Sequence, residues 1–211
     1  YAQASGKTGV VNVHVAPGLG NAIGMMYNAL KASAPIIVTA GQQDTRMRLR
    51  DPVLGHDLVA MAAPVTKWSV QAERADELPL LLHRAFKVAN DPPAGPVFVA
   101  LPIDVLEQES DNEPMAPGTL HRAGPAAPAG VAEAAALLAG RQSPVIVVGD
   151  EVARFFAGAE VVALAEALGA AIWTEGIRIH ASVPSNHPNF RLALGFDALS
   201  IRKALEGADA V

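Results

Sequence analysis

The chain has 211 residues, of which 51% are hydrophobic and 18% are charged, and its formal net charge is −5 at pH 7. With a pI near 5.6, it lacks the excess of basic residues by which proteins bind nucleic acid or anionic membranes. The absence of cysteine excludes disulfides and thiolate metal sites, and fits a reducing, cytoplasmic compartment. No apolar run approaches the ~20 residues that span a bilayer, so the sequence indicates a soluble α/β protein.

The first half of the chain predicts alternating strands and helices. Short apolar runs alternate with stretches whose apolar residues recur at helical spacing, which is the pattern of βαβ units in a parallel sheet. The run Val10–Val15 predicts a buried first strand, and Pro17, Gly18 and Gly20 predict a tight turn after it. Strands are expected at residues 7–15, 36–40, 64–69 and 97–101, and helices at residues 21–32, 56–62 and 75–89.

A polar segment from Gln42 to Gly55 separates the second strand from the next helix. A loop of this length inside a compact unit is usually functional or mobile. Arg46, Arg48 and Arg50 in this loop could bind a carboxylate or a phosphate, or could simply form a solvated surface. The sequence alone leaves both alternatives open.

The second half of the chain predicts a linker and another α/β segment. Residues 109–130 are polar and then rich in proline, alanine and glycine, so they have little apolar surface to bury and predict an interdomain linker. Gly169 is expected to end a helix in the left-handed conformation. Beyond the linker, helices are expected at residues 131–139, 157–168 and 199–205, and strands at residues 144–149 and 171–174.

The predicted fold is α/β, with two doubly wound parallel-sheet units, each a three-layer α/β/α arrangement, at residues 1–108 and 131–211. The chain begins like the last turn of a helix and stops where an apolar strand is expected to begin. We therefore expect both units to be incomplete, the first at its start and the second at its end.

His14 lies close to the carboxyl end of the first predicted strand. Ligands of parallel α/β sheets bind beyond the carboxyl ends of the strands, so a histidine here is a candidate for a titrating group that faces a pocket. The alternative is a core histidine whose ring is hydrogen-bonded in the interior. The spacing of Gly18, Gly20 and Gly24 resembles a dinucleotide-binding fingerprint, but no acidic residue ends the second strand, so a tight turn explains the glycines as well.

Three stretches carry a resemblance to a known enzyme family. They are residues 12–24 (Asn-Val-His-Val-Ala-Pro-Gly-Leu-Gly-Asn-Ala-Ile-Gly), residues 37–43, which end in Gly-Gln-Gln, and residues 91–104 (Asp-Pro-Pro-Ala-Gly-Pro-Val-Phe-Val-Ala-Leu-Pro-Ile-Asp). The first part of the chain resembles the pyrimidine-binding domain of thiamine-diphosphate-dependent enzymes, closest to the benzoylformate decarboxylase branch. The residues from about 125 onward resemble the central domain of the same enzymes.

The resemblance implies an enzyme that decarboxylates a 2-oxo acid to an aldehyde and CO₂ with thiamine diphosphate. It implies that His14 transfers protons during the reaction. Pro17 and Asn21 fall where the family lines the site of the pyrimidine and thiazolium rings. Val53 and Leu54 fall where a pair of apolar residues shapes the substrate pocket, and a branched pair there favours an aromatic or bulky 2-oxo acid.

The resemblance also implies parts of the enzyme that these residues do not supply. In the family, a glutamate upstream of the position of Tyr1 activates the cofactor, and a C-terminal domain holds its diphosphate and Mg²⁺. The chain is therefore expected to be an inactive fragment of a homodimeric or homotetrameric decarboxylase. Two alternatives remain: a thiamine-dependent carboligase similar to acetolactate synthase, and a non-catalytic module with a vestigial site.

Overall fold

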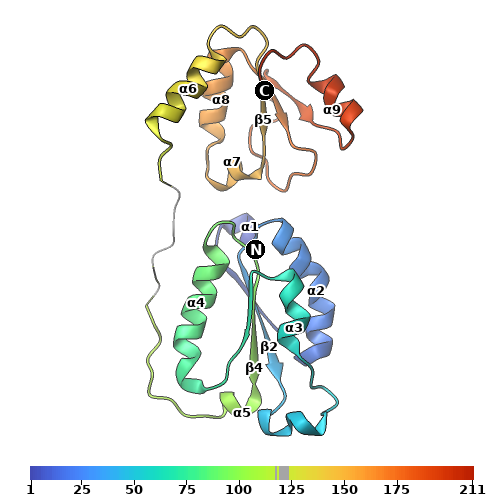
Figure 1. Ribbon diagram of the computed structural model, residues 1–211, viewed down its shortest axis with the longest axis vertical. Helices are drawn as coiled ribbons and strands as arrows, with labels where there is room; N and C mark the ends of the chain where they lie inside the picture. The colour runs from blue at the N-terminus through green and yellow to red at the C-terminus, as the bar shows by residue number, and fades with distance from the viewer. Residues whose placement is uncertain (117, 119–123) are drawn as a thin grey trace. The chain divides into compact units, whose positions relative to one another are not determined.

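The structure is a computed structural model that describes residues 1–116, 118 and 124–211 (Figure 1). The chain forms two compact units, Tyr1–Ala123 and Gly124–Val211. Each unit holds a parallel sheet that is flanked by helices, which confirms the predicted α/β class.

Four parallel strands form the sheet of the first unit: β1 (Gly9–Val13), β2 (Ile36–Gln42), β3 (Trp68–Gln71) and β4 (Val97–Pro102). Their order is β1-β2-β4-β3, so β2 and β4 are central. All four overlap predicted strands, because short runs rich in Val, Ile and Phe suit the buried positions of a parallel sheet. The third begins later than expected because residues 63–65 form a short 3₁₀-helix.

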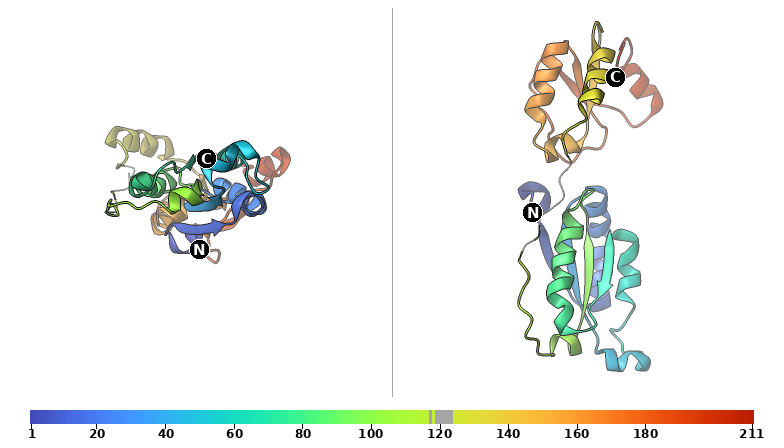
Figure 2. Two further views of the ribbon diagram at one scale, coloured as in Figure 1. Left: turned by 90° about the horizontal axis from the view of Figure 1, so that it is seen from below. Right: turned by 60° about the vertical axis from the view of Figure 1, so that its left-hand side comes forward.

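Helices cover both faces of this sheet, as Figure 2 shows. Helices α2 and α3 pack on one face and α4 packs on the other, which gives the predicted three layers. The helices are α1 (Ala2–Ser5), α2 (Val15–Lys31), α3 (Leu58–Ala62), α4 (Leu78–Asn90) and α5 (Ile103–Leu106), with 3₁₀-helices η1 (Thr45–Arg50), η2 (Ala63–Val65) and η3 (Ala75–Glu77).

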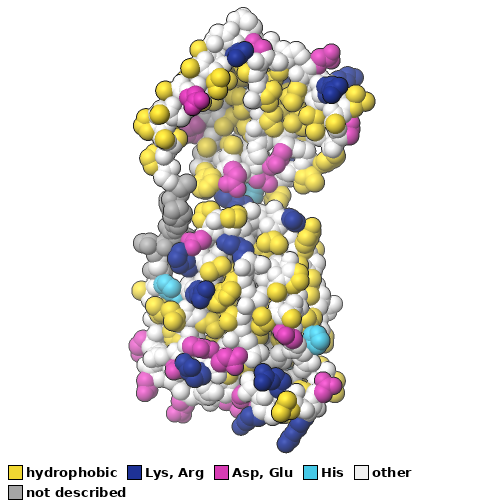
Figure 3. All heavy atoms as spheres, in the orientation of Figure 1, with side chains coloured by type: hydrophobic (Ala, Val, Ile, Leu, Met, Phe, Trp, Pro, Cys, Tyr) yellow, Lys and Arg dark blue, Asp and Glu magenta, His cyan; other side chains and the backbone are white. Residues whose placement is uncertain are grey.

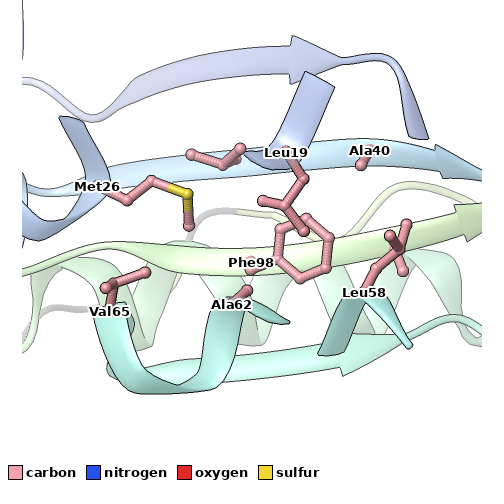
Figure 4. Packing of buried hydrophobic residues seen from close by; sticks show 9 residues of the cluster. Leu19, Met26, Ala40, Leu58, Ala62, Val65 and Phe98 are labelled. Atoms are coloured by element: carbon pink, nitrogen blue, oxygen red, sulfur yellow. The ribbon is translucent and has the colours of Figure 1, made fainter. Parts of the chain in front are cut away.

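The core between the sheet and helices α2 and α3 is centred on Phe98 of β4, which is fully buried (Figure 4). Leu19 and Met26 reach it from α2, and Leu58 and Ala62 reach it from α3. Burying a side chain of this size stabilises a fold by about 1.5–3 kcal/mol. This packing fixes α2, and therefore the residues at its start, against the sheet.

Helix α2 begins earlier than expected and absorbs the predicted turn. It starts at Val15, so Pro17, Gly18 and Gly20 lie in its first two turns and the prediction of a Pro-Gly turn is wrong. Proline fits because a first-turn amide has no carbonyl partner within the helix. The burial of Leu19 against the sheet outweighs the low helix propensity of the glycines.

The prediction that the first strand is buried is also wrong. Val10 and Val11 are 60% and 50% exposed. Within the described residues β1 is an edge strand, and neither helix layer extends over these two side chains. An apolar run shows that a strand can be buried. It does not show whether that strand lies at the centre or at the edge of the sheet.

The segment that follows β4 returns along the first unit. The side chain of Gln108 accepts a hydrogen bond from the amide of Ala75 (3.0 Å), and the Asn112 carboxamide donates to the carbonyl of Asp76 (2.6 Å). Asn112 lies at the start of the segment predicted as a linker, and Gln108 lies directly before it. Residues 117 and 119–123 of that segment lie outside the described residues.

The second unit is built on three parallel strands, β5 (Val145–Val148), β6 (Ala171–Thr174) and β7 (Phe190–Ala193), in that order. The first two were predicted and β7 was not. Near the end of the chain, Ala210 forms an isolated parallel bridge with Pro144, just before β5.

The helices of the second unit match the prediction except for one short addition. They are α6 (Pro128–Leu138), α7 (Asp150–Arg154), α8 (Gly158–Leu168) and α9 (Ala198–Ala204), and α7 is the addition. Gly169 ends α8 with φ 64°, as predicted. Helix α6 begins inside the predicted linker because Pro128 suits the first helical position. No helix in the described part of the chain is long and apolar enough to cross a bilayer.

Candidate active site

The carboxyl ends of the four strands of the first unit meet at one edge of its sheet, because all four strands are parallel. The edge lies beside α5 and η1 in Figure 1. His14 follows β1, Gln43 follows β2 and Ala72 follows β3. Ligands of open parallel sheets bind at such an edge. This edge of the sheet is therefore the candidate site.

His14 is the N-cap residue of α2, in an extended conformation with φ −97° and ψ 110°. Its side chain is exposed and makes no capping hydrogen bond to the helix. The alternative of a buried, internally satisfied histidine is therefore excluded. The imidazole is open to a ligand at the edge of the sheet.

Two further predicted site residues lie in the first turns of α2, directly after His14. Pro17 and Asn21 are four positions apart in this helix, a spacing that places both on one side of it. Both are exposed. His14 precedes the helix in an extended conformation, so the three predicted residues are near one another in the chain and all three are exposed.

A cavity of about 560 Å³ lies at the carboxyl ends of β2 and β3. Its size is typical of small-molecule sites. It is lined by residues 42–45, 48, 51, 52, 55–57, 59, 71 and 73. Val53 and Leu54 are not among these residues, although their neighbours Pro52 and Gly55 are; Val53 is 98% exposed.

Gln42 ties together the two ends of the loop that forms most of this cavity. Its carboxamide nitrogen donates to the carbonyl of His56 (2.7 Å), and its carboxamide oxygen accepts from the amide of Gln43 (2.8 Å). Both ends of the side chain are therefore used to hold the loop. Gln42 positions the cavity wall.

A second pair of hydrogen bonds joins the loop to α5, the short helix that follows β4. Asp104, at the start of α5, accepts hydrogen bonds from the amide and the hydroxyl of Thr45. Burial acts to raise the pKa of this carboxyl, but the two bonds from Thr45 prevail and hold the pKa below its usual value. The carboxylate is thus kept ionised and fixes the start of η1.

The arginines of the loop have different environments. Arg46 pairs with Asp44, and the side-chain hydrogen bond from this guanidinium holds the pKa of the Asp44 carboxyl below its usual value. Arg48 lines the cavity, whereas Arg50 does not. Figure 3 shows Lys and Arg side chains beside Asp and Glu side chains at this end of the first unit. The site is therefore of mixed charge rather than a basic anion cradle.

Among the described residues, no group of three or more His, Asp or Glu side chains is placed to hold a metal ion. The roles of Gln42, Thr45 and Asp104 were not foreseen in the sequence. A local signal existed, since Gln42 is the last residue of the central strand β2 and Asp104 comes two residues after the end of the central strand β4. Their partners His56 and Thr45 are brought to them only by the fold.

Comparison with known proteins identifies the family of both units. Residues 1–61 match the model of the thiamine pyrophosphate enzyme N-terminal TPP binding domain. Residues 131–211 match the model of the thiamine pyrophosphate enzyme central domain. The first match contains the whole of β1, α2 and β2, and with them the edge that carries His14.

Individual relatives match the chain almost from end to end. Benzoylformate decarboxylase of Pseudomonas aeruginosa is 32% identical over 214 residues, which are 100% of this chain and 40% of that protein. A probable acetolactate synthase large subunit of Methanocaldococcus jannaschii is 30% identical over 97% of this chain and 35% of that protein. The crystal structure of benzoylformate decarboxylase from Polynucleobacter necessarius superposes with a TM-score of 0.92 at 33% identity, covering 100% of this chain and 40% of that one.

The chain thus spans about 40% of the length of these decarboxylases. Two models of one family match its two units, and the observed α/β folds agree with both. This protein belongs to the thiamine pyrophosphate enzyme family.

Proposed function

We propose that this chain supplies one side of the active site of a thiamine-diphosphate-dependent decarboxylase that converts an aromatic or bulky 2-oxo acid, such as benzoylformate, to an aldehyde and CO₂. The observation that carries the proposal is the exposed imidazole of His14 at the carboxyl end of β1, directly before the helix that carries the exposed Pro17 and Asn21. The similarity of the chain to two benzoylformate decarboxylases supports the choice of reaction.

The residues at this edge fit the rings of the cofactor. Pro17 offers an apolar ring, and Asn21 offers an exposed carboxamide that can both donate and accept. The cavity at the carboxyl ends of β2 and β3 is large enough for a small heterocycle. When bound, thiamine diphosphate supplies the electron sink that decarboxylation requires. In this proposal Mg²⁺ and the diphosphate bind to a separate domain, an expectation that comes from the family resemblance.

His14 is proposed to move a proton to or from the bound substrate. The imidazole is suited to this task because its unperturbed pKa lies near neutrality. It lies on the N-cap residue just before the helix and is exposed, and no hydrogen bond within the described residues occupies its ring nitrogens. A ring nitrogen can therefore approach a substrate without first breaking a protein contact.

Val53 and Leu54 are proposed to contact the substituent of the 2-oxo acid. They lie in the chain between Pro52 and Gly55, which line the cavity, and Val53 is almost fully exposed. Two apolar side chains next to cavity-lining residues offer a surface for an aromatic ring. Replacing Leu54 by Ala is expected to reduce the preference for benzoylformate over pyruvate.

The test of the proposed function is an assay of the full-length protein with benzoylformate, thiamine diphosphate and Mg²⁺. Release of CO₂ and benzaldehyde is expected, with a much lower turnover for His14→Ala and little change in its affinity for the cofactor. Absence of CO₂ from every aryl or branched 2-oxo acid would overturn the reaction. Equal turnover of variant and parent would overturn the role of His14.

A second candidate function is carboligation by the same cofactor. It is favoured by the 30% identity to the probable acetolactate synthase large subunit over 97% of this chain. The resemblance weighs against it, because acetolactate synthase-like relatives usually have a small hydroxyl residue at the position of His14. Analysis of the products formed from pyruvate or glyoxylate separates the two: a free aldehyde supports decarboxylation, and a joined carbon skeleton supports ligation.

The proposal extends to assembly and location. In the family that the chain resembles, the pyrimidine-binding domain faces a domain of a neighbouring subunit, so a homodimer or homotetramer is proposed. The proposed location is the cytoplasm. Sedimentation of the full-length protein and cell fractionation test these points. A non-catalytic module remains the alternative, and it predicts that the residues preceding Tyr1 lack the activating glutamate.

A further inference from the structure

The junction between β1 and α2 contains an unusual backbone conformation next to His14. Val15 has φ 42°, in the left-handed region. β-Branched residues are rarely found there, because the branched side chain collides with the backbone. Val15 is also only 3% exposed, so its side chain is held in the core while its backbone is strained. Such strain persists only where the surroundings impose it.

The left-handed residue turns the chain abruptly from strand to helix. The carbonyl of His14 accepts a hydrogen bond from the amide of Gly18 (2.8 Å), which closes the first turn of α2 directly over the end of β1. Because this amide is bound to His14, it does not point outward to cradle a phosphate. Gly18 therefore serves the junction rather than a dinucleotide.

Gly18 is the glycine that the junction requires. A Cβ atom placed on it would lie 3.3 Å from Cβ of Val13 and 3.6 Å from Cβ of His14, and the first of these contacts is tighter than nearly all real ones. A Cβ placed on Gly20 or Gly24 of the same helix would meet nothing within 4 Å. A side chain at position 18 would thus press on the end of the strand that presents the imidazole.

We propose that Val15 and Gly18 are positioning residues, which together set where His14 presents its imidazole at the edge of the sheet. The side chain of Val15, the residue after His14, is buried in the core and fixes the backbone there. Gly18 leaves room for the helix to pack against the end of the strand. The inference rests on the proposed function, because the role of His14 in proton transfer is part of that proposal.

The first experiment compares Gly18→Ala with the matched control Gly24→Ala in the full-length protein. Alanine should stabilise an open helical position, so Gly24→Ala is expected to raise Tm and leave turnover within twofold of the parent. Gly18→Ala is expected to gain less stability, to shift the NMR signals of the His14 imidazole, and to lower kcat roughly tenfold to a hundredfold at unchanged KM for the cofactor. Equal imidazole signals and equal turnover in both variants would overturn the proposal.

The second experiment compares Val15→Ala with Val15→Gly. Both variants lose the buried isopropyl group, but only glycine adopts φ 42° without strain. If the left-handed conformation places His14, Val15→Gly is expected to keep more turnover and a higher Tm than Val15→Ala. A higher turnover for Val15→Ala would show that this conformation does not place His14.

The variant His14→Ala separates failure of this inference from failure of the proposed function. If turnover is unchanged without the imidazole, the proposed role of His14 is wrong. If turnover is lost in His14→Ala but is parental in Gly18→Ala and in Val15→Ala, the positioning inference alone is wrong. The NMR comparison needs no cofactor and reports the imidazole environment in either case.

Discussion

Asp104 accepts two hydrogen bonds from Thr45, one from its amide at 2.9 Å and one from its hydroxyl at 2.5 Å. The pair joins the loop after β2 to the first turn after β4, across 59 positions of sequence. It holds the loop that forms most of the candidate cavity. The charge of Asp104 should therefore affect both the stability of the first unit and the shape of the site.

The pH dependence of this pair follows from the lowered pKa of Asp104. The folded pKa lies below the unfolded value of about 3.9, so the stabilisation is complete above pH ~4 and is lost as pH falls through the folded pKa. Asp104→Asn is expected to lower the free energy of unfolding by about 1 kcal/mol at pH 7, because a neutral amide replaces the charged acceptor. The deficit should shrink as the pH falls below about 4 and through the folded pKa.

The measurement is urea unfolding followed by tryptophan fluorescence. Trp68 lies in the first unit and Trp173 in the second, so a Trp173→Phe background reports the first unit alone. Thr45→Ser, which keeps the hydroxyl, is the matched control and should lose less than Thr45→Val. A deficit of Asp104→Asn that stays constant from pH 7 to pH 2 would contradict the assignment.

Gln42 is expected to control the order of the cavity loop. In Gln42→Ala the amide of Gln43 loses its acceptor, a change of about 1 kcal/mol, so its hydrogen exchange should be roughly fivefold faster. Gln42→Glu retains an acceptor for that amide but has no donor for the carbonyl of His56. Exchange at Gln43 should therefore remain slow in Gln42→Glu. Fast exchange in both variants would show that the loop depends on the bond to His56 instead.

The core beneath α2 is expected to depend on Phe98. Phe98 is fully buried among side chains of α2, α3 and β2, so Phe98→Ala should cost about 3–5 kcal/mol. Phe98→Leu keeps most of the volume and should cost less. Unfolding monitored at Trp68 in the Trp173→Phe background measures both. Equal losses in the two variants would indicate that cavity formation is not the cause.

Much of the fold was predictable because most strands and helices follow from local sequence patterns. Strands β1, β2 and β4 of the first unit and β5 and β6 of the second were expected from short apolar runs, and a strand overlapping β3 was expected at residues 64–69. Gly169 was expected from its place at a helix end. Strand β7 was not, because Phe190–Ala193 is mostly exposed and its pairing with β6 is irregular. Such a strand is defined by its partner rather than by its own pattern.

The candidate site was predictable only in part. His14 stood out as a polar residue at the end of an apolar strand, and it is exposed there in the structure. The glycine turn was expected from composition, but core packing of α2 extended the helix through it. The contribution of Gln71 and Glu73 to the cavity depends on strand order, which no local pattern reveals.

Lys67 is expected to stabilise the end of α4 from within the fold. Its ammonium group donates to the carbonyl of Val88 (2.5 Å), in the last turn of that helix, and to the carbonyl of Asp91 (2.6 Å), its C-cap residue. Partial burial lowers the pKa of Lys67, and the negative charge of Asp91 acts in the opposite direction. Lys67→Met would leave both carbonyls without this donor, at a cost of about 1–3 kcal/mol.

The matched control for Lys67 is Lys87→Met. Lys87 pairs with the carboxylate of Asp91 at the surface, and a pair as exposed as this one contributes about 0–1 kcal/mol. Unfolding monitored at Trp68 should therefore show a large loss for Lys67→Met and a small one for Lys87→Met. The loss at Lys87 should fall further in 1 M salt, whereas the loss at Lys67 should persist, because partly buried bonds are screened less. Losses of equal size and equal salt dependence would place Lys67 among ordinary surface charges.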